Sequence, residues 1–385
     1  MAGFTSTDNM IYNMSTLGNQ YLASFSKQFN PTAAAVANEI HTLFRGGGQP
    51  QADAIFDTGT SLMFQSLTDQ VTSGGNLYHG QNIGAAGDGY KVLTYIQTGT
   101  AAATTAPGTL YLIDLLGWMR VTPVTVTTAQ TTIWSNTFTA DAGTDIITYT
   151  NDWQPYTKVQ FTTTTTLPAG LSLATDYWLV RQSSTTAKVA TSYANAIAGT
   201  TVDITDAGTG THTLTAKLPR YSDGAGVDAF FFNPQATALG AGTPALTLGY
   251  TNSAGTASRA TPTTPSAPVG KTAASNSHVL YTGATGVGKF GLEVPRQGAD
   301  GGIRSVETIR NSSTYTSGMY TVGLYKELAR IPVTTLGING ERGMVFDVPS
   351  QPRVYDGAAL YFLWKSGVAT PANSIIDGHL IFGWS

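Results

Sequence analysis

The stretch LYLIDLLGWM, Leu110 to Met119, is the longest apolar run of the chain and carries a single charge, Asp114. A helix that crosses a bilayer needs about 20 consecutive apolar residues, so this run has about half the required length. This run and GYKVLTYIQTG, which precedes it, are rich in the β-branched and aromatic residues that are typical of strands bounded by glycine turns. The run therefore predicts a buried strand in a soluble chain.

The composition favours a chain that packs against other proteins. Charged residues make up only 11% of the 385 residues, against about 25% in an ordinary soluble domain. The net charge is −3, so there is no basic surplus to neutralise phosphates, and we expect no nucleic-acid binding. A weakly charged surface of Thr, Ser, Asn, Gln and Gly has little self-repulsion and suits contacts with copies of itself.

Cysteine usage and the first residues bear on the compartment. The chain has no cysteine, which excludes disulfides and thiolate metal sites. The N-terminal stretch MAGFTSTDNMIYNMSTLGNQ has neither a charged n-region nor an apolar h-region, so we expect no secretory signal. The sequence thus predicts synthesis in the cytoplasm and no association with a membrane.

The expected fold is mainly β, with a jelly-roll-like or β-sandwich main body formed by residues 51–125 and 218–385. Two continuous apolar runs, VDAFFFN (Val227 to Asn233) and ALYFLW (Ala359 to Trp364), predict strands that are buried on both faces or in a subunit interface. The terminal aromatic residues Phe382 and Trp384 lie where chain ends normally fray. We therefore expect them to be tucked into a core or a neighbour.

Residues 1–50 predict short N-terminal helices. Tyr21, Leu22, Phe25 and Phe29 recur at helical spacing before Asn30-Pro31 breaks the chain. A second helical stripe follows in TAAAVANEIHTLF, formed by Val36, Ile40, Leu43 and Phe44, with Thr32 as its N-cap. These helices either pack beneath the main body or form an arm that grips a neighbour.

Residues 126–217 predict an inserted Ig-like β-sandwich. Threonine is dense here, and KVQFTTTTT places Val159 and Phe161 on one face with polar residues on the other. About seven short strands with turns between them are typical of a small sandwich, and loop tips tolerate such insertions. Residues 251–277, rich in Thr, Ala, Pro and Ser, predict an extended loop or arm.

Two motifs invite a catalytic interpretation. GATGVGK, Gly283 to Lys289, fits the core of a phosphate-binding loop, but Phe290 stands where Ser or Thr would ligate magnesium, and Pro295 follows where a helix should run. Asp57-Thr58-Gly59 resembles the active-site loop of aspartic proteases, whose chemistry needs two such carboxylates, and no second copy occurs. We interpret Lys289 as a loop charge and Asp57 as a turn residue.

The remaining candidate side chains form no motif. Ser24 to Lys27 spell S-x-x-K on the predicted N-terminal helix, without the partner motifs of an acylating serine. The histidines and glutamates lack metal-ligand spacing; they are His41, His79, His212, His278 and His379, and Glu39, Glu293, Glu307, Glu327 and Glu341. The sequence therefore predicts no catalytic residue, no cofactor site and no metal site, and a protein that is not an enzyme.

Several segments nevertheless resemble a known class of proteins. TTTTTLPAGLSLATDYWLVRQSSTTAKVA and DITDAGTGTHTL resemble a small β domain that recurs in virion proteins of tailed bacteriophages. HTLFRGGGQP, LYLIDLLGW, DAFFFN, ATPTTPSAPVGKT, IPVTTLGI and DGHLIFGWS resemble a family of phage structural proteins. The resemblance implies a head-associated virion subunit of the capsid shell, cement or decoration type.

The same resemblance implies the partners. They would be other virion proteins such as the major capsid protein. We also expect the chain to bind copies of itself, as a homotrimer. The threonine-rich surface of the inserted domain would either contact host glycans weakly or simply occupy space. A tail component, such as a fibre, spike or adaptor, is the alternative, although the chain shows no repeat period. A glycan-binding β-sandwich protein or carbohydrate-active enzyme is the alternative from another class.

Overall fold

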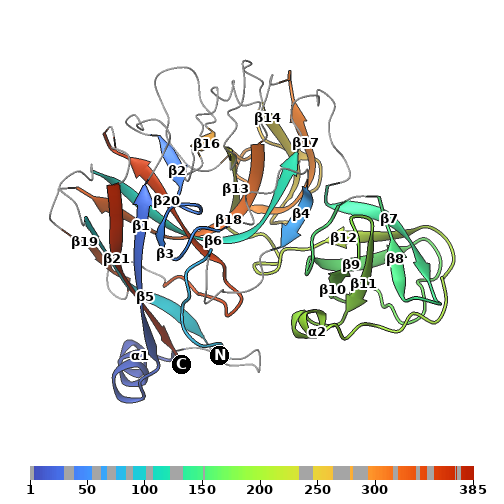
Figure 1. The fold of residues 1–385 in the computed structure, drawn as a ribbon, viewed down its shortest axis with the longest axis horizontal. Helices are drawn as coiled ribbons and strands as arrows, with labels where there is room; N and C mark the ends of the chain where they lie inside the picture. The colour runs from blue at the N-terminus through green and yellow to red at the C-terminus, as the bar shows by residue number, and fades with distance from the viewer. Residues whose placement is uncertain are drawn as a thin grey trace.

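The computed structural model describes residues 4–29, 39–53, 62–66, 75–83, 90–100, 107–121, 133–150, 152–233, 246–262, 278–280, 294–314, 320–334, 339–344, 351–368, 370 and 374–385. They form a mainly β protein of antiparallel sheets with a few short helical turns, which confirms the expected fold class. A small barrel stands beside the larger main body (Figure 1).

A five-stranded sheet forms one layer of the main body. Its order is β19-β5-β21-β1-β3, and every neighbouring pair is antiparallel. The first and last strands of the chain, β1 and β21, pair over ten residues at its centre. The strands are β1 (Gln20–Phe29), β3 (Gly48–Gln49), β5 (Lys91–Thr100), β19 (Gly340–Gly343) and β21 (Ser374–Trp384).

A seven-stranded sheet forms the second layer, in the order β18-β13-β16-β2-β20-β6-β4. Because β6 also pairs with β18, six of these strands close into a ring around an aromatic core that includes Phe44, Phe230 and Tyr361. The strands are β2 (Ile40–Thr42), β4 (Leu62–Ser66), β6 (Gly108–Val121), β13 (Val227–Asn233), β16 (His278–Leu280), β18 (Tyr320–Val333) and β20 (Leu360–Ser366).

The apolar run Leu110 to Met119 lies in β6, and all of its residues are buried. Successive side chains of a strand point to opposite faces, so the run packs against a core on each side. Tyr111, Ile113 and Leu115 point into the aromatic core of the ring. Leu110 and Leu112 face the five-stranded sheet, where a second core includes the Phe25 and Phe362 rings, 4.4 Å apart. The prediction of a buried strand is confirmed.

The other two apolar runs also behave as predicted. The three phenylalanines of β13, residues 230–232, and Leu360 to Trp364 of β20 are buried within the chain on both faces. The last aromatic residues, Phe382 and Trp384, are buried as well. They belong to β21, whose pairing with β1 and β5 holds this end of the chain in the sheet.

The N-terminal helical prediction is wrong for Gln20–Phe29, which is strand β1, and for Ile40–Thr42, which is strand β2. Residues 30–38, the remainder of the second predicted helix, lie outside the described residues. Tyr21, Phe25 and Phe29 are four residues apart, a spacing that fits one face of a helix and one face of a strand. Pairing with β21 decided between the two.

The helical turns lie earlier, in α1 (Thr7–Ile11) and the π-helical turn η1 (Tyr12–Thr16). The Ser6 hydroxyl accepts a hydrogen bond from the Asn9 amide and so caps α1. Met10 is buried, whereas Ile11 and Tyr12 are half exposed. No helix of the described residues is long and apolar enough to cross a membrane.

The segment predicted as an inserted Ig-like sandwich contains a closed six-stranded barrel, β10-β11-β8-β7-β12-β9. Val159 and Phe161 point into it, as predicted. Six strands form where seven were expected, because residues 200–205 are irregular and a helix, α2 (Tyr193–Ala198), precedes them. The strands are β7 (Ser135–Asp141), β8 (Ile146–Thr148), β9 (Lys158–Thr163), β10 (Tyr177–Arg181), β11 (Thr186–Ala190) and β12 (His212–Ala216).

The predicted arm is in part regular structure. A three-stranded sheet contains β14 (Leu246–Asn252), β15 (Arg259–Ala260) and β17 (Ile303–Asn311), so the first residues of the arm form a hairpin. Asp300 fastens this sheet by accepting hydrogen bonds from Arg259, Tyr250 and Asn252, which lower the pKa of its carboxyl to about 2. Residues 263–277 of the arm lie outside the described residues.

We expect Gly378→Ala to destabilise the protein by about 1–3 kcal/mol, the usual range for overpacking. A Cβ at this position would lie 2.0 Å from the Gln97 carbonyl oxygen and 2.8 Å from the Phe25 ring. Gly99→Ala is the control, because the nearest atoms there belong to side chains that can rotate. Urea unfolding followed by fluorescence measures both variants, and equal midpoints would contradict the prediction.

Candidate functional site

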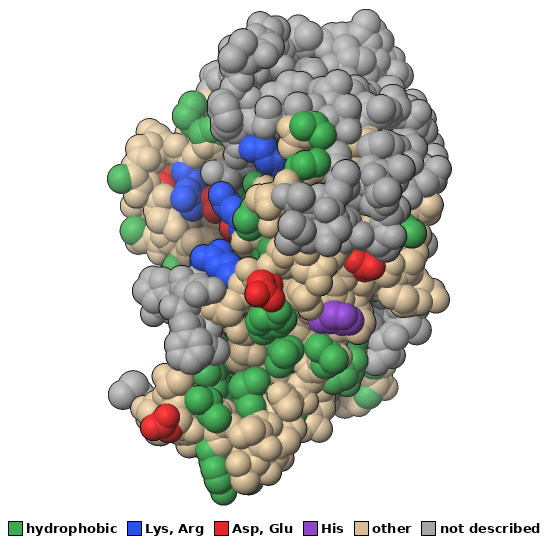
Figure 2. Space-filling model, turned by 90° about the vertical axis from the view of Figure 1, so that its left-hand side faces the viewer, with side chains coloured by type: hydrophobic (Ala, Val, Ile, Leu, Met, Phe, Trp, Pro, Cys, Tyr) green, Lys and Arg blue, Asp and Glu red, His purple; other side chains and the backbone are tan. Residues whose placement is uncertain are grey.

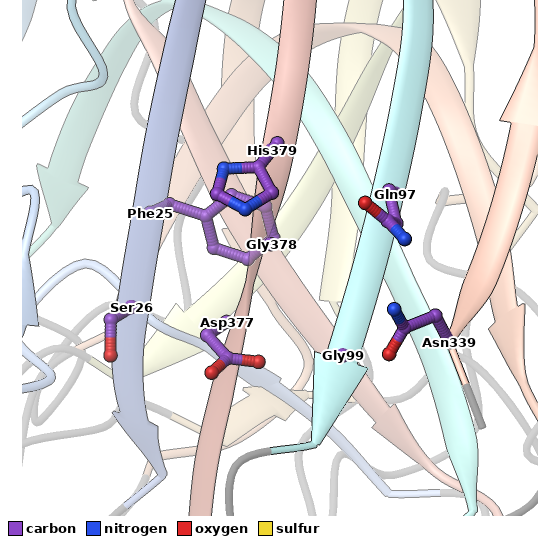
Figure 3. A pocket seen from close by; sticks show the side chains of 8 residues that line it. All are labelled: Phe25, Ser26, Gln97, Gly99, Asn339, Asp377, Gly378 and His379. Atoms are coloured by element: carbon purple, nitrogen blue, oxygen red, sulfur yellow. The ribbon is translucent and has the colours of Figure 1, made fainter. Parts of the chain in front are cut away.

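The solvent-facing side of the five-stranded sheet carries an open groove of about 450 Å³, which we call the sheet groove. Strands β1, β5 and β21 and the residue before β19 contribute its walls and floor (Figure 3). Its lining residues are Phe25, Ser26, Gln97, Gly99, Asn339, Asp377, Gly378 and His379.

Strand register brings these residues together. Asp377 lies opposite Ser26 of β1 on one side and opposite Gly99 of β5 on the other. Gly340 lies opposite Thr98, so Asn339 comes next to Gly99 in the same row across the sheet. The neighbouring row contains His379 and Gln97. Cross-strand neighbours are about 4.5–5.5 Å apart, so the two rows form one polar surface.

Gly99 makes the surface hollow. It occupies a position that faces solvent in β5, between Asp377 and Asn339. A Cβ there would lie 2.9 Å from Asp377 Oδ1 and 3.1 Å from Asn339 Oδ1. Both side chains turn toward the space above Gly99 (Figure 3). The carboxylate and the amide therefore converge on a space that any other residue would fill.

The sequence did not single out these residues as a site. The available signal was a glycine within the predicted strand GYKVLTYIQTG, because a glycine inside a strand often marks a close approach by a ligand or by backbone. Glycine is so abundant, at 43 residues, that this signal does not stand out. The two rows come from separate segments of the chain, which only pairing aligns.

A second groove, of about 570 Å³, lies on the barrel. Threonines 137, 139, 148, 150 and 211 line it together with Phe138, Tyr149 and His212. His212 uses both ring nitrogens within the barrel: Nδ1 lies 2.9 Å from Thr163 Oγ1 and Nε2 lies 3.1 Å from the Ala207 carbonyl oxygen. This histidine therefore fixes the loop that precedes β12.

Asp114 and Arg220 form a buried ion pair inside the main body. Arg220 Nε donates to Asp114 Oδ2 at 2.9 Å, and its Nη2 donates to Oδ1 at 2.6 Å. The amide of Ala359 also donates to Asp114 Oδ1, at 3.0 Å. Both side chains are almost completely buried. The pair joins β6 to the segment that follows the barrel, which makes it a structural element.

We expect Arg220→Met to destabilise the protein by about 3–5 kcal/mol, because it leaves the Asp114 carboxylate buried without its partner. Replacing both residues, as Asp114→Leu with Arg220→Met, should recover much of this loss. Lys188→Met, which breaks a partly exposed pair with Asp145, should cost less than about 1 kcal/mol. Urea unfolding of the three variants measures the difference; similar losses for Arg220→Met and Lys188→Met would refute the prediction.

His79 lies in a second buried polar cluster. Its Nε2 lies 3.0 Å from the Ala358 carbonyl oxygen, and its Nδ1 lies 3.4 Å from the Lys91 ammonium, which also pairs with Asp356 at 3.3 Å. This geometry fits a neutral imidazole that donates through Nε2 and accepts through Nδ1. Burial and the Lys91 charge lower the pKa of His79 to about 3.

This shift predicts a pH-dependent stability. In the unfolded chain His79 binds a proton near its ordinary pKa of about 6.5, so between pH 6.5 and 3 the unfolded state holds more protons than the folded state. The free energy of unfolding should therefore fall as the pH drops through this window, by up to about 1.4 kcal/mol per pH unit from this residue.

Thermal unfolding between pH 4 and 7 tests the assignment. His79→Phe should flatten the dependence of the melting temperature on pH. His379→Asn, at an exposed histidine, should leave that dependence as in the wild type. Curves of equal slope for the wild type and His79→Phe would show that other groups carry the pH dependence.

The structure describes some of the motifs that the sequence analysis considered and not others. Asp57 and Lys289 lie outside the described residues, as does the His278 side chain. In S-x-x-K, the strand places Ser24 and Lys27 on opposite faces: Ser24 is exposed, whereas the Lys27 ammonium is buried and donates to the Gly46 and Pro50 carbonyl oxygens. Burial lowers the pKa of Lys27 to about 8. The two side chains cannot act together.

The remaining acidic and histidine side chains stay dispersed. His41 pairs with Glu39 at 3.7 Å in a buried position. Glu327 pairs with Arg330, and Glu341 accepts a hydrogen bond from Tyr95. Glu307 accepts from Thr251 and Ser305, and Glu293 lies outside the described residues. Among the described residues, no three His, Asp or Glu side chains gather as a metal site would require.

Comparisons with known proteins add no family. No family model matches the sequence, and no curated protein matches it. Two solved chains of the VP2 protein of infectious bursal disease virus align with it: a mutant form at 8% identity with a TM-score of 0.16, and the Gx strain at 9% with a TM-score of 0.14. They cover 97% and 94% of this chain, and 82% and 80% of their own. Scores this low carry no argument about fold or function.

Proposed function

We propose that the protein is a self-assembling structural subunit of a bacteriophage virion, of the capsid shell, cement or decoration type. The observation that carries the proposal is an exposed apolar surface near the N-terminus, which we call the N-terminal patch. Its members are Ile11, Tyr12, Leu17 and Leu22, each at least half exposed. Figure 2 shows hydrophobic side chains gathered over the lower part of this side of the molecule.

The N-terminal patch adjoins a strand edge. β3 pairs with β1 only at Ser26 and Lys27, so within the described residues the first half of β1 has no strand on that side. Exposed strand edges pair readily with other chains, and exposed apolar patches commonly mark protein interfaces. Leu22 lies on this edge and is 58% exposed. A second copy of the chain is the partner that suits an uncharged surface of this kind.

Two further features support a structural role in a particle. Charged residues are scarce over the whole chain, which suits repeated symmetric contacts. The resemblance of several segments to phage structural proteins supplies the virion context. Localisation in the virion and contact with a major capsid protein belong to the same proposal, as does the absence of an enzymatic activity.

Self-association in solution tests the proposed interface. We expect the wild type to form a homotrimer, three times 40.3 kDa, in light scattering coupled to gel filtration. Leu22→Asp should weaken the association by about tenfold or more, because burying one leucine contributes about 1.5–3 kcal/mol. Leu173→Asp is the matched control, because Leu173 is 61% exposed on the barrel. A wild type that stays monomeric at high concentration would contradict the proposal.

The place of the protein in a particle tests the virion assignment. Mild dissociation of purified particles, followed by quantitative mass spectrometry of the fractions, gives its copy number and location. A head subunit should appear in many copies with the shell fraction. A low copy number in the tail fraction would support the alternative of a fibre, spike or adaptor instead.

A further inference from the structure

Four polar side chains of the sheet groove have no hydrogen-bond partner among the residues that the structure describes. Within the described part of the chain, the side chains of Ser26, Gln97, Asn339 and Asp377 form no hydrogen bond. They come from four adjacent segments of one sheet and face the same space (Figure 3). An amide or carboxylate on an ordinary surface is solvated singly. Here two amides, one carboxylate and one hydroxyl surround one hollow, which is the arrangement of a small-molecule site with convergent polar groups.

We propose that the sheet groove binds a neutral saccharide. The proposal is independent of self-assembly and goes beyond it, because it assigns a ligand to a surface that the N-terminal patch does not include.

The charge of the groove selects the class of ligand. Asp377 is the only Asp, Glu, Lys or Arg among the lining residues that the structure describes. Phosphates, nucleic acids and acidic sugars need Lys, Arg or several backbone amides, and the described part of the lining contains no Lys or Arg. A carboxylate accepts hydrogen bonds only, whereas the amides of Gln97 and Asn339 both donate and accept. This mixture matches the hydroxyl groups of a sugar ring, each of which also donates and accepts.

The shape of the groove fits the same ligand. Its volume of about 450 Å³ lies within the range of about 300–1,000 Å³ that is usual for small-molecule sites. The hollow at Gly99 lets a ligand hydroxyl reach both Asp377 and Asn339.

His379 is held at the side of the groove. Its Nδ1 lies 3.0 Å from Ser24 Oγ, on the neighbouring strand, which leaves Nε2 as the ring atom available to a ligand. The hydrogen bond fixes the ring without removing it from the lining. The groove therefore offers polar atoms along two cross-strand rows, as an extended ligand of one or two sugar rings requires.

Saturation-transfer NMR of the full chain with glucose, galactose, mannose, N-acetylglucosamine and N-acetylgalactosamine tests the proposal. We expect at least one sugar to give a signal that a non-sugar polyol, glycerol, does not give. Asp377→Asn removes the carboxylate and should weaken binding by about tenfold or more, because a hydrogen bond to a charged group contributes that much. Gly99→Val fills the hollow and should weaken binding by about tenfold or more as well, because the ligand hydroxyl can then no longer reach Asp377.

Glu341→Gln is the matched control. It makes the same carboxylate-to-amide change on the same sheet, at a residue that pairs opposite Gln97 but does not line the groove. It should leave sugar binding unchanged, and a melting curve for each variant confirms that it folds. Absence of a signal from every sugar, or a signal that Gly99→Val leaves intact, would overturn the proposal. A signal lost instead with His212→Ala would place the sugar on the barrel and overturn it equally.

The self-association measurement and the sugar-binding measurement can be contradicted independently of each other. Leu22→Asp should disrupt association and leave the sugar signal in place, whereas Gly99→Val should do the reverse. A monomeric wild type that still binds sugar would leave the groove assignment standing while removing the proposed interface.

Discussion

The buried ion pair between Asp114 and Arg220 is the constraint on which the main body depends. It places a carboxylate in the most apolar strand of the chain, where an unpartnered charge would be strongly unfavourable. Its partner comes from the segment that follows the barrel, and the Ala359 amide adds a hydrogen bond from the residue before β20. One carboxylate thus ties two separate segments to β6, those that contain Arg220 and Ala359.

The same strand also packs against the five-stranded sheet. β6 presents one face to the aromatic core of the closed ring and the other to the sheet that contains both ends of the chain. This packing buries the inner face of the five-stranded sheet. Only the outer face of the sheet can therefore contact a ligand or another chain. The outer face has two parts. Near the N-terminal turns it carries exposed apolar side chains, and around the sheet groove it carries two rows of polar side chains. The two proposals rest on these two parts.

Local sequence patterns predicted some elements and misled on others, for identifiable reasons. Continuous apolar runs such as Leu110 to Met119 predicted buried strands correctly, because a run that is apolar on both sides can only be covered on both faces. The helix predicted over Gln20–Phe29 was wrong, because aromatic residues four apart share a face in either periodicity. The same change of periodicity separated Ser24 from Lys27, which a helix would have kept near one another.

The sequence by itself determined the mainly β class, the buried strands and the scarcity of charge. These properties follow from the residue types and from the spacing of apolar residues within each segment, and neither depends on the rest of the chain. Only the tertiary structure decided that the strands between residues 135 and 216 close into a barrel, and that Asp377, Gly99 and Asn339 form one row. The physical reason is that strand register is a property of pairs: a shift by one residue turns every side chain to the opposite face, and no single strand contains the information that prevents it.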